Sequence, residues 1–317
     1  MTAIPLDGPS CADAPPNSST VVTRRATETG FEYLLLHRSH AVNTGPWAWT
    51  PPSGQRLPGE AVHPAALRRL HEGTGLTDTE IRPVDLGRNH ALWMTRDITA
   101  RRPVLNHEHD DYIWVGAEES TKLCQPSIVA SSMTTVDAIP DVEMDFRSLT
   151  DNDFALLSQW SHRRHLTPAW FHRALTTTGA ADRYRACLDP DHPINVHILR
   201  INGVDVGIAQ LASVADLPDH LAATGKSDDI AIGFAIAERR WIGKGLGPQL
   251  IWSIICRLVM PRQPTPARVV AFTARGNRAS ARALHKAGFT TDGTVQLGGR
   301  RRTMHCFNPG YWLGNNQ

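Results

Sequence analysis

The stretch Arg240-Trp241-Ile242-Gly243-Lys244-Gly245-Leu246-Gly247 decides the fold of the second half of this chain. It lies between residues 230–236, which have the pattern of a strand, and a helical pattern that ends near residue 260. Glycines at alternate positions leave main-chain amides uncovered, and the helix that follows adds unpaired donors and partial positive charge. We therefore expect a pyrophosphate site along residues 242–247.

A second motif follows at residues 277–289, Asn277-Arg278-Ala279-Ser280-Ala281-Arg282-Ala283-Leu284-His285-Lys286-Ala287-Gly288-Phe289. Its spacing predicts a helix at 277–287, after a strand at 267–273. Three further predictions concern local elements: a hairpin around Asn202-Gly203 between strands at 195–200 and 205–212, a helix capped at 150–153 and passing through Trp160, and a late strand at 303–307.

Together the two motifs resemble those of the GNAT N-acetyltransferases. Arg240, Gly243 and Gly245 match the family's Arg/Gln-x-x-Gly-x-Gly/Ala loop, and Asn277 and Gly288-Phe289 bound its last motif-bearing helix. The resemblance covers about residues 142–310 and is strongest to the aminoglycoside 6'-N-acetyltransferase and hydroxylysine-acyltransferase branch. It implies a GNAT fold with a mixed, mainly antiparallel central sheet.

The resemblance also implies that the cofactor is acetyl-CoA or another acyl-CoA. The cofactor-binding residues would be Ile236, Arg240, Ile242, Gly243, Lys244, Gly245, Leu246, Gly247 and Asn277. The strand that ends at Ile236 would pair with the pantetheine arm, which Asn277 would also touch, and Arg240 and Lys244 would add charge near the phosphates. In direct attack of an amine on the thioester, the protein mainly orients the reactants.

The acid and base of this reaction do not follow from the resemblance, because the sequence departs from the family. The helix tyrosine of the family is Leu284 here, and the strand aspartate of many aminoglycoside enzymes is Gly233. Asp228 and Asp229, just before the strand, are the candidate bases. His285 is a further catalytic candidate, although a surface histidine on a helix is the simpler interpretation.

An acidic loop and several aromatic residues are candidates to bind the acceptor. The loop holds Asp216, Asp219, Asp228 and Asp229, and it would suit a polycationic amine or be simply solvated. Candidate residues lining the acceptor site are Trp160, His165, Trp170 and Phe171, for which core packing is the alternative. The run at residues 300–302, three arginines, would meet an anionic acceptor or form a charged turn.

The first half of the chain carries a different motif, between residues 54 and 76. It resembles the Nudix box, G-x5-E-x7-R-E-U-x-E-E-x-G-U, at Gly54, Glu60, Arg68, Leu70, Glu72, Gly75 and Leu76. The resemblance covers about residues 19–140 and implies a Nudix-like α/β/α sandwich. The pattern places a helix at 61–73 and strands at 20–23, 31–36 and 112–115.

The Nudix box normally holds divalent cations with several carboxylates on one helix face. Two of these positions are Arg69 and Gly73 here, which leaves Glu72, with Glu60 in support. We therefore expect no metal and no hydrolysis. The alternative is that the run at residues 107–111, His-Glu-His-Asp-Asp, supplies compensating ligands.

Length and composition suit a soluble protein of two domains. The 317 residues are 41% hydrophobic and 20% charged, without an apolar run of membrane-spanning length or a signal-peptide pattern. Five scattered cysteines favour the cytoplasm. Residues 1–140 carry 12 basic and 16 acidic residues, and residues 141–317 carry 21 and 15, too small a basic excess to predict nucleic-acid binding.

These patterns predict a flexible tail at 1–18, a Nudix-like domain at 19–140 and a GNAT domain at 141–317, with a linker over 129–145. The leading functional hypothesis is transfer of an acetyl group to an amine of a small molecule, with antibiotic modification as the role and a homodimer as the assembly to be tested, and with no membrane or nucleic-acid partner. The alternatives are a non-catalytic CoA or nucleotide sensor and an atypical Nudix hydrolase.

Overall fold

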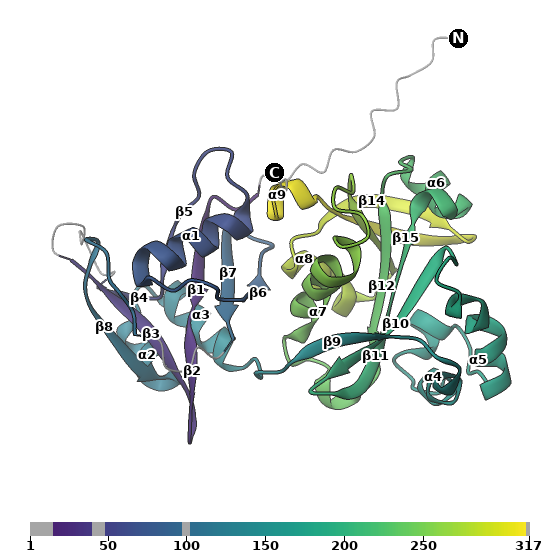
Figure 1. The fold of residues 1–317 in the computed structure, drawn as a ribbon, viewed down its shortest axis with the longest axis horizontal. Coiled ribbons are helices and arrows are strands. Elements are labelled where there is room, and N and C mark those ends of the chain that lie inside the picture. The colour runs from purple at the N-terminus through teal and green to yellow at the C-terminus, as the bar shows by residue number, and fades with distance from the viewer. Residues whose placement is uncertain (1–14, 40–47, 97–101, 315–317) are drawn as a thin grey trace, which may run out of the picture.

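The computed structural model describes residues 15–39, 48–96 and 102–314, and Figure 1 shows two α/β halves side by side. Most of the predicted tail falls on residues 1–14, outside the described residues; the first strand begins at Ser18. In both halves the helices cover the faces of sheets, so the predicted α/β class is confirmed.

The N-terminal half contains two small sheets with helices packed against them. In the first sheet the strand order is β5 (Ser53–Gln55), β1 (Ser18–Val22), β7 (His90–Thr95), β6 (Ile81–Asp85). In the second, β3 (Gly30–Arg38) pairs with β2 (Arg24–Thr27), β4 (Trp49–Thr50) and β8 (His109–Gly116). The helices are α1 (Val62–Thr74), α2 (Ala117–Leu123) and α3 (Ser127–Asp137). The predicted helix of this half is present, shifted by one residue, and the predicted strands are present with somewhat different bounds.

The predicted linker over 129–145 is wrong for most of its length. Residues 127–137 form α3, which buries Met133 and Val136 against the N-terminal core. Residues 144–148 form β9, the first strand of the C-terminal sheet. Only about six residues connect α3 to β9, and they hold Ile139 and Val142 buried in the core.

The C-terminal half is built on one seven-stranded sheet. The strand order is β14 (Thr290–Leu297), β15 (Arg300–Phe307), β13 (Val269–Ala274), β12 (Ile230–Ile236), β11 (Val204–Ser213), β10 (Ile194–Ile201), β9 (Met144–Ser148). All neighbours are antiparallel except β12 and β13, which agrees with the predicted mixed, mainly antiparallel sheet. Asn202 and Gly203 both adopt positive φ and close the predicted β10–β11 hairpin.

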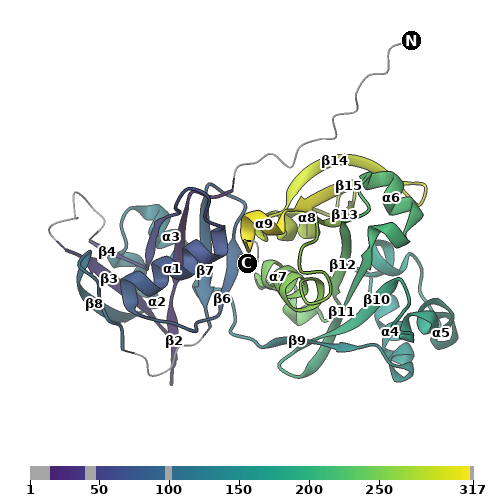
Figure 2. The same cartoon turned by 45° about the horizontal axis from the view of Figure 1, so that its top comes forward.

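Helices cover both faces of this sheet, as Figures 1 and 2 show. One face carries α4 (Phe154–Ser161), preceded by η1 (Asp151–Asp153), then η2 (Thr167–Phe171), α5 (Thr177–Tyr184) and η3 (Arg185–Leu188). The other face carries α7 (Leu246–Ile254), preceded by η5 (Arg239–Trp241) and extended by η6 (Ile255–Val259), and α8 (Arg278–Lys286). The remaining helices are η4 (Val214–Asp216), α6 (Pro218–Thr224) and α9 (Pro309–Trp312).

Helix α7 lies between the two halves and is apolar on almost every side. Leu246, Leu250 and Ile254 join the core of the C-terminal sheet, while Trp252 meets Trp93 of β7. Figure 2 shows α7 between β6 and the C-terminal sheet. A helix with apolar residues all round is stable only when covered on both sides, which explains why the halves share one continuous hydrophobic core.

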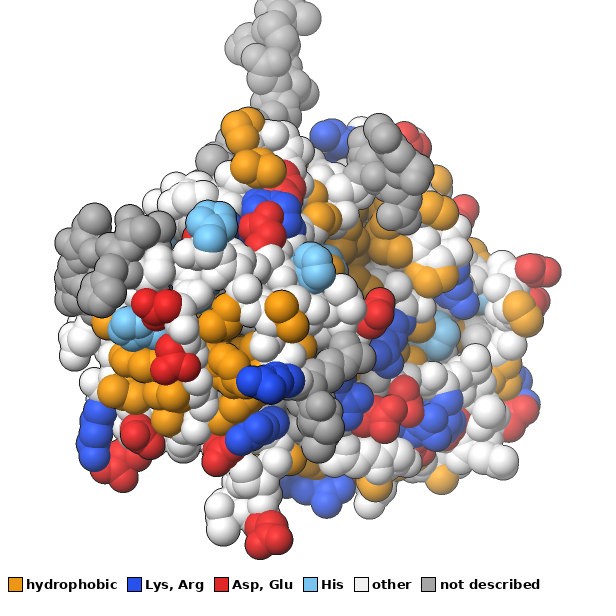
Figure 3. All heavy atoms as spheres, turned by 60° about the vertical axis from the view of Figure 1, so that its left-hand side comes forward, with side chains coloured by type: hydrophobic (Ala, Val, Ile, Leu, Met, Phe, Trp, Pro, Cys, Tyr) orange, Lys and Arg blue, Asp and Glu red, His pale blue; other side chains and the backbone are white. Residues whose placement is uncertain are grey.

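Neither the described helices nor the charges visible in Figure 3 indicate a membrane-spanning segment or a surface of one charge. Among the described residues, no helix has the length and hydropathy needed to cross a membrane. On the face of the N-terminal half turned forward in Figure 3, basic side chains lie beside acidic ones, so charges of opposite sign alternate there.

Candidate functional site

The central feature of the C-terminal sheet is the place where its two parallel strands part. β12 and β13 pair over three residues, from Ile230 opposite Val269 to Ile232 opposite Ala271. Beyond that point β12 continues to Ile236 and β13 to Ala274 without pairing to each other. Residues 233–236 still pair with β11 along one edge, but on the edge turned toward β13 they have no strand partner in this sheet. Backbone groups on that edge can therefore bond a partner other than a strand.

The glycine loop follows β12 on the open side of this parting. Gly243 and Gly245 both have a φ of +77°, a conformation that suits glycine, and Gly245 caps the start of α7. Residues 242–245 are exposed, and among the described backbone hydrogen bonds none uses an amide of residues 243–245 as donor. The first amides of α7 likewise have no partner within the helix. This geometry fits an anionic diphosphate.

Close packing fixes the position of the loop from both sides. A Cβ on Gly245 would lie 2.8 Å from Cγ1 of Ile139, and one on Gly247 would lie 2.8 Å from Cβ of Ala283 in α8. Ile139 is held by the guanidinium of Arg24, whose Nη1 donates to the Ile139 carbonyl at 2.9 Å. The N-terminal half therefore supports the loop directly.

The other predicted cofactor residues lie around the same loop. Arg240 and Lys244 are exposed, and the Arg240 guanidinium lies over the Trp241 ring, 5.5 Å from its centroid. Ile236 ends β12. The Asn277 side chain caps α8 by accepting from the Ser280 amide at 3.2 Å, so its first role is structural.

Three of the predicted acceptor residues from the α4–α5 region differ in their surroundings. Trp160 is fully buried in the core beneath α4, which contradicts its prediction as an acceptor contact. Phe171 is buried in the same core. His165 Nε2 lies 3.2 Å from the Ile236 carbonyl at the end of β12.

Trp170 has a position suited to an acceptor contact. It is partly exposed, and its indole Nε1 donates to the Tyr184 hydroxyl at 3.1 Å. A Cβ on Gly233 would lie 3.2 Å from the Trp170 ring. The missing side chain at Gly233 is thus what allows the indole to lie against β12.

Asp229 cannot be the general base that the sequence suggested. Its side chain is fully buried and forms an ion pair with Arg268, Oδ2 to Nη2 2.6 Å, and the same guanidinium holds Asp292 at 2.9 Å. Asp228 is exposed. Both aspartates precede Ile230, so they lie past the paired end of β12 and β13, away from the open part. The prediction failed because the chain position before a strand does not show which end of the sheet is open.

His285 also lies away from the parting. A Cβ on Gly87 of the N-terminal half would clash with the His285 ring, so the imidazole lies against that residue. It lines a cavity of about 310 Å³ between the halves, together with Arg88 and Trp312. Leu284, one residue earlier, is buried in the core, and a helix step turns the next side chain by about 100°. The catalytic prediction for His285 is therefore wrong.

The acidic loop lies on the surface, and sequence reasoning missed a residue within it. Asp216 and Asp219 are exposed, and Asp219 lies near Gly298 of the β14–β15 turn. His220, the next residue, packs its ring edge-on against Phe272 of β13, with centroids 5.3 Å apart. The signal in the sequence was only a histidine beside an aspartate, which does not reveal the contact with a strand 52 residues away.

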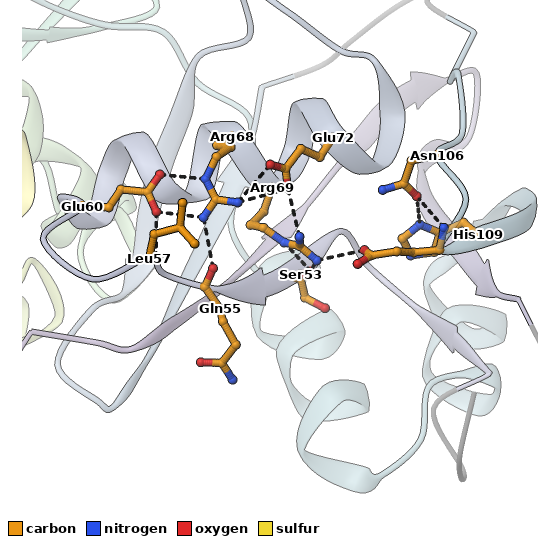
Figure 4. Close-up of polar contacts among 10 residues, drawn as sticks. Ser53, Gln55, Leu57, Glu60, Arg68, Arg69, Glu72, Asn106 and His109 are labelled. Atoms are coloured by element: carbon orange, nitrogen blue, oxygen red, sulfur yellow. Dashed lines mark hydrogen bonds and ion pairs between the residues drawn. The ribbon is translucent and has the colours of Figure 1, made fainter. Parts of the chain in front are cut away.

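The motif of the N-terminal half forms a dense ion-pair network on α1, drawn in Figure 4. Arg68 binds Glu60, Nε to Oε1 2.7 Å, and Glu72, Nη1 to Oε1 3.0 Å. Arg69 binds Glu72 at 2.9 Å and, from the β8 side, Glu108 at 3.0 Å. Its Nε and Nη2 also point to the Ser53 carbonyl, at 3.4 and 3.3 Å.

These contacts change the proton affinities of the carboxylates. The hydrogen bond from Arg68 holds the pKa of Glu60 below its usual value. Burial acts to raise the pKa of Glu108, but the nearby Arg69 guanidinium outweighs it and lowers that pKa. Both carboxylates are therefore ionised and neutralised by arginines.

Comparison with known proteins supports both motifs. The model of the acetyltransferase (GNAT) domain matches residues 150–297, and that of the NUDIX domain matches residues 15–134. The chain joins a NUDIX domain to a GNAT acetyltransferase domain. The resemblance to the GNAT N-acetyltransferases, predicted from the glycine loop and the motif at residues 277–289 together, is thereby confirmed, and with it the expected acyl-CoA-dependent N-acetyltransferase class.

Relatives of the two domains are distinct proteins. The GNAT domain is 25% identical over 152 residues to aminoglycoside N(6')-acetyltransferase type 1 of Klebsiella pneumoniae. This alignment covers 47% of this chain and 75% of the relative. The NUDIX domain is 28% identical over 117 residues to the asymmetrical bis(5'-nucleosyl)-tetraphosphatase of Sus scrofa, which covers 32% of this chain and 75% of the relative.

One solved structure shares the fold of the GNAT domain. AAC(6')-Ib in complex with paromomycin and acetyl-CoA aligns with a TM-score of 0.50 at 21% identity, and the alignment covers 55% of this chain and 98% of that one. It supports the GNAT fold of the second half.

The NUDIX domain does not fit a divalent cation at its helix α1. The Arg69 guanidinium lies between the carboxylates of Glu72 and Glu108 and faces the Ser53 carbonyl, so a positive charge already occupies the space between these oxygens. In the described parts of the chain, no three acidic, histidine or cysteine side chains gather as a metal site. This holds also for the run at residues 107–111, where His109 Nδ1 contacts Asn106 Oδ1 at 2.9 Å.

Proposed function

We propose that this protein transfers the acetyl group of acetyl-CoA to a primary amine of a small molecule. The observation that carries the proposal is the parting of β12 and β13, which ends at exposed amides of the glycine loop. Bound acetyl-CoA supplies the thioester carbonyl that an amine attacks. The chain then has to bind the diphosphate, align the pantetheine arm and orient the amine.

Each of these tasks has residues suited to it. Amides along 242–247 and the start of α7 would bind the diphosphate, with Arg240 and Lys244 adding positive charge. Beyond its last pair with β13, the edge of β12 turned toward β13 would bond the amide groups of the pantetheine arm, as far as Ile236, in the manner of a neighbouring strand. Trp170 would contact the acceptor beside Gly233.

The acceptor class follows from chemistry and from the relatives. The relative from Klebsiella pneumoniae is named for aminoglycosides. Asp216 and Asp219 supply exposed negative charge, and Asp219 lies near Gly298 of the β14–β15 turn. Aminoglycosides therefore come first in the acceptor panel, followed by aliphatic diamines. Modification of an antibiotic is the biological role that this proposal includes.

The test is a steady-state assay of free-thiol release from acetyl-CoA with kanamycin, paromomycin, cadaverine and lysine as acceptors. We expect turnover with at least one amine and a product heavier by one acetyl group in mass spectrometry. Binding of CoA without turnover on any amine would contradict the transferase proposal and favour the CoA-sensor alternative.

A further inference from the structure

Four partly buried side chains surround the point where β12 and β13 part, on the sheet face away from α7. Gln210 of β11 lies opposite Gly233, and the Trp170 ring lies against Gly233. Phe272 is the first residue of β13 beyond the last pair with β12. It shares its sheet face with Val270, which packs with Ala231, Met304 and Cys306 rather than with α7.

His220 is the fourth of these side chains, and it comes from the opposite direction to Trp170. Its helix, α6, lies beside β14 in both ribbon views. The His220 ring meets Phe272 edge-on, with an interplanar angle of 82°. Trp170 thus stands over β12 and His220 over β13, one on each side of the parting.

An amine acceptor needs a proton acceptor at this point. Alkylamines are protonated at neutral pH and cannot attack a carbonyl until a proton leaves. Burial lowers the pKa of His220, while Asp219 acts in the opposite direction, so the imidazole is neutral at pH 7 and able to accept that proton.

The ionisable neighbours of His220 are few. β13 carries none, and η4 carries the exposed Asp216. β14 carries Asp292, which is held by Arg268. Asp219 on α6 itself is exposed. The imidazole of His220 contacts Phe272, the first residue of β13 beyond the paired segment.

We propose that His220 is the general base of the acetyl transfer, an inference that rests on the function proposed above. The imidazole removes one proton from the acceptor ammonium and passes it to solvent. The amine nitrogen then forms its bond to the thioester carbonyl carbon while the carbon–sulfur bond breaks. The second proton of the nitrogen goes to the departing thiolate, so that an amide, a free thiol and one solvent proton are formed.

The decisive experiment compares acceptors that do and do not need this base. His220→Asn keeps a polar side chain of similar shape but cannot accept a proton near pH 7. With cadaverine or kanamycin we expect kcat to fall about 100-fold, a usual effect for a lost general base. With hydroxylamine, already neutral at pH 7.5, we expect less than about a fivefold change, because no ammonium proton must be removed first. The matched control, His71→Asn on the exposed surface of α1, should resemble the wild type with both acceptors.

A second measurement needs no variant and no turnover. Diethyl pyrocarbonate should modify His220 in the wild-type protein, and CoA with kanamycin should slow that modification at least severalfold, as read by peptide mass spectrometry. Equal loss of kcat with both kinds of acceptor, no loss at all, or unprotected modification would overturn the proposal for His220. Failure of the proposed function is distinct, because the wild type itself would then acetylate none of these amines.

Discussion

The indole rings of Trp93 and Trp252 meet nearly edge to face, with centroids 5.1 Å apart and an interplanar angle of 77°. Trp93 belongs to β7 of the NUDIX domain and Trp252 to α7, the helix that begins at the glycine loop. The same interface includes the bond from the Leu86 amide to the Lys286 carbonyl, at 2.8 Å. The NUDIX domain therefore packs against and supports α7 and α8, the helices next to the glycine loop.

Replacing Trp252 by alanine should destabilise both domains together. The indole is almost fully buried, and removal of a buried tryptophan costs about 3–5 kcal/mol in the free energy of unfolding. Urea denaturation followed by circular dichroism and by fluorescence should show one coincident transition at a lower midpoint. The control Tyr311→Ala, at a side chain 48% exposed, should change stability by about 0.5 kcal/mol or less. Two separate transitions in the wild type would contradict a shared core.

Stability should decrease in mild acid because of a histidine at this same interface. The His63 ring of α1 packs against both Trp93 and Trp252, with centroid distances of 5.4 and 5.5 Å, and burial lowers the pKa of His63 to about 4. The unfolded chain takes up this proton near pH 6.5, so protonation favours unfolding as the pH falls from about 6.5 towards 4. His63→Phe should make the unfolding free energy less dependent on pH. The remaining dependence comes from the other histidines whose pKa burial lowers, which are His90, His109, His197, His220 and His305. An unchanged slope would show that His63 is not the group responsible.

The interpretation of the aspartates before β12 can be tested by separating stability from catalysis. Asp228→Asn should leave kcat and the KM for acetyl-CoA within about twofold, because this residue lies beyond the paired end of the strands. Arg268→Met should lower the free energy of unfolding by about 3–5 kcal/mol, because it leaves Asp229 and Asp292 buried without their partner. A large loss of kcat in a well-folded Asp228→Asn variant would restore that residue as the base.

The NUDIX domain should gain cation binding when its internal positive charge is removed. In Arg69→Gln, Glu72 and Glu108 lose the guanidinium between them, so the melting temperature should fall in EDTA and recover with millimolar Mn²⁺. The wild type should show no Mn²⁺-dependent shift. The double variant Arg69→Gln/Glu108→Gln should lose the recovery. A wild-type protein that is stabilised by Mn²⁺, or that releases phosphate from nucleoside diphosphate derivatives, would support the hydrolase alternative.

The features that the sequence predicts are those determined by residues close together in the chain. The glycine loop, the Asn202-Gly203 turn and the strand ending at Ile236 depend on nearby residues, and their elements lie where expected. The predicted linker overlaps helix α3, because the buried face of that helix consists of only Met133 and Val136, too few residues to give a clear helical period.

The predictions about site residues that the structure contradicts concern side chains whose contacts come from distant segments of the chain. Arg268 pairs with Asp229 across 39 residues, and Glu108 meets Arg69 across the same separation. Phe272, which positions His220, lies on a strand whose neighbours are known only once the sheet order is known. The elements that carry the motifs could thus be predicted from local sequence, while the contact partners of their residues could be identified only from the fold.

Isothermal titration calorimetry with CoA measures whether the glycine loop binds the diphosphate of that cofactor. We expect the wild type to release or absorb heat on binding one CoA per chain. Gly245→Glu, which forces a side chain onto a φ of +77° and against Ile139, should bind none while keeping a cooperative unfolding transition. No binding heat with the wild type, or unchanged affinity in a folded Gly245→Glu variant, would contradict the placement of the diphosphate at this loop.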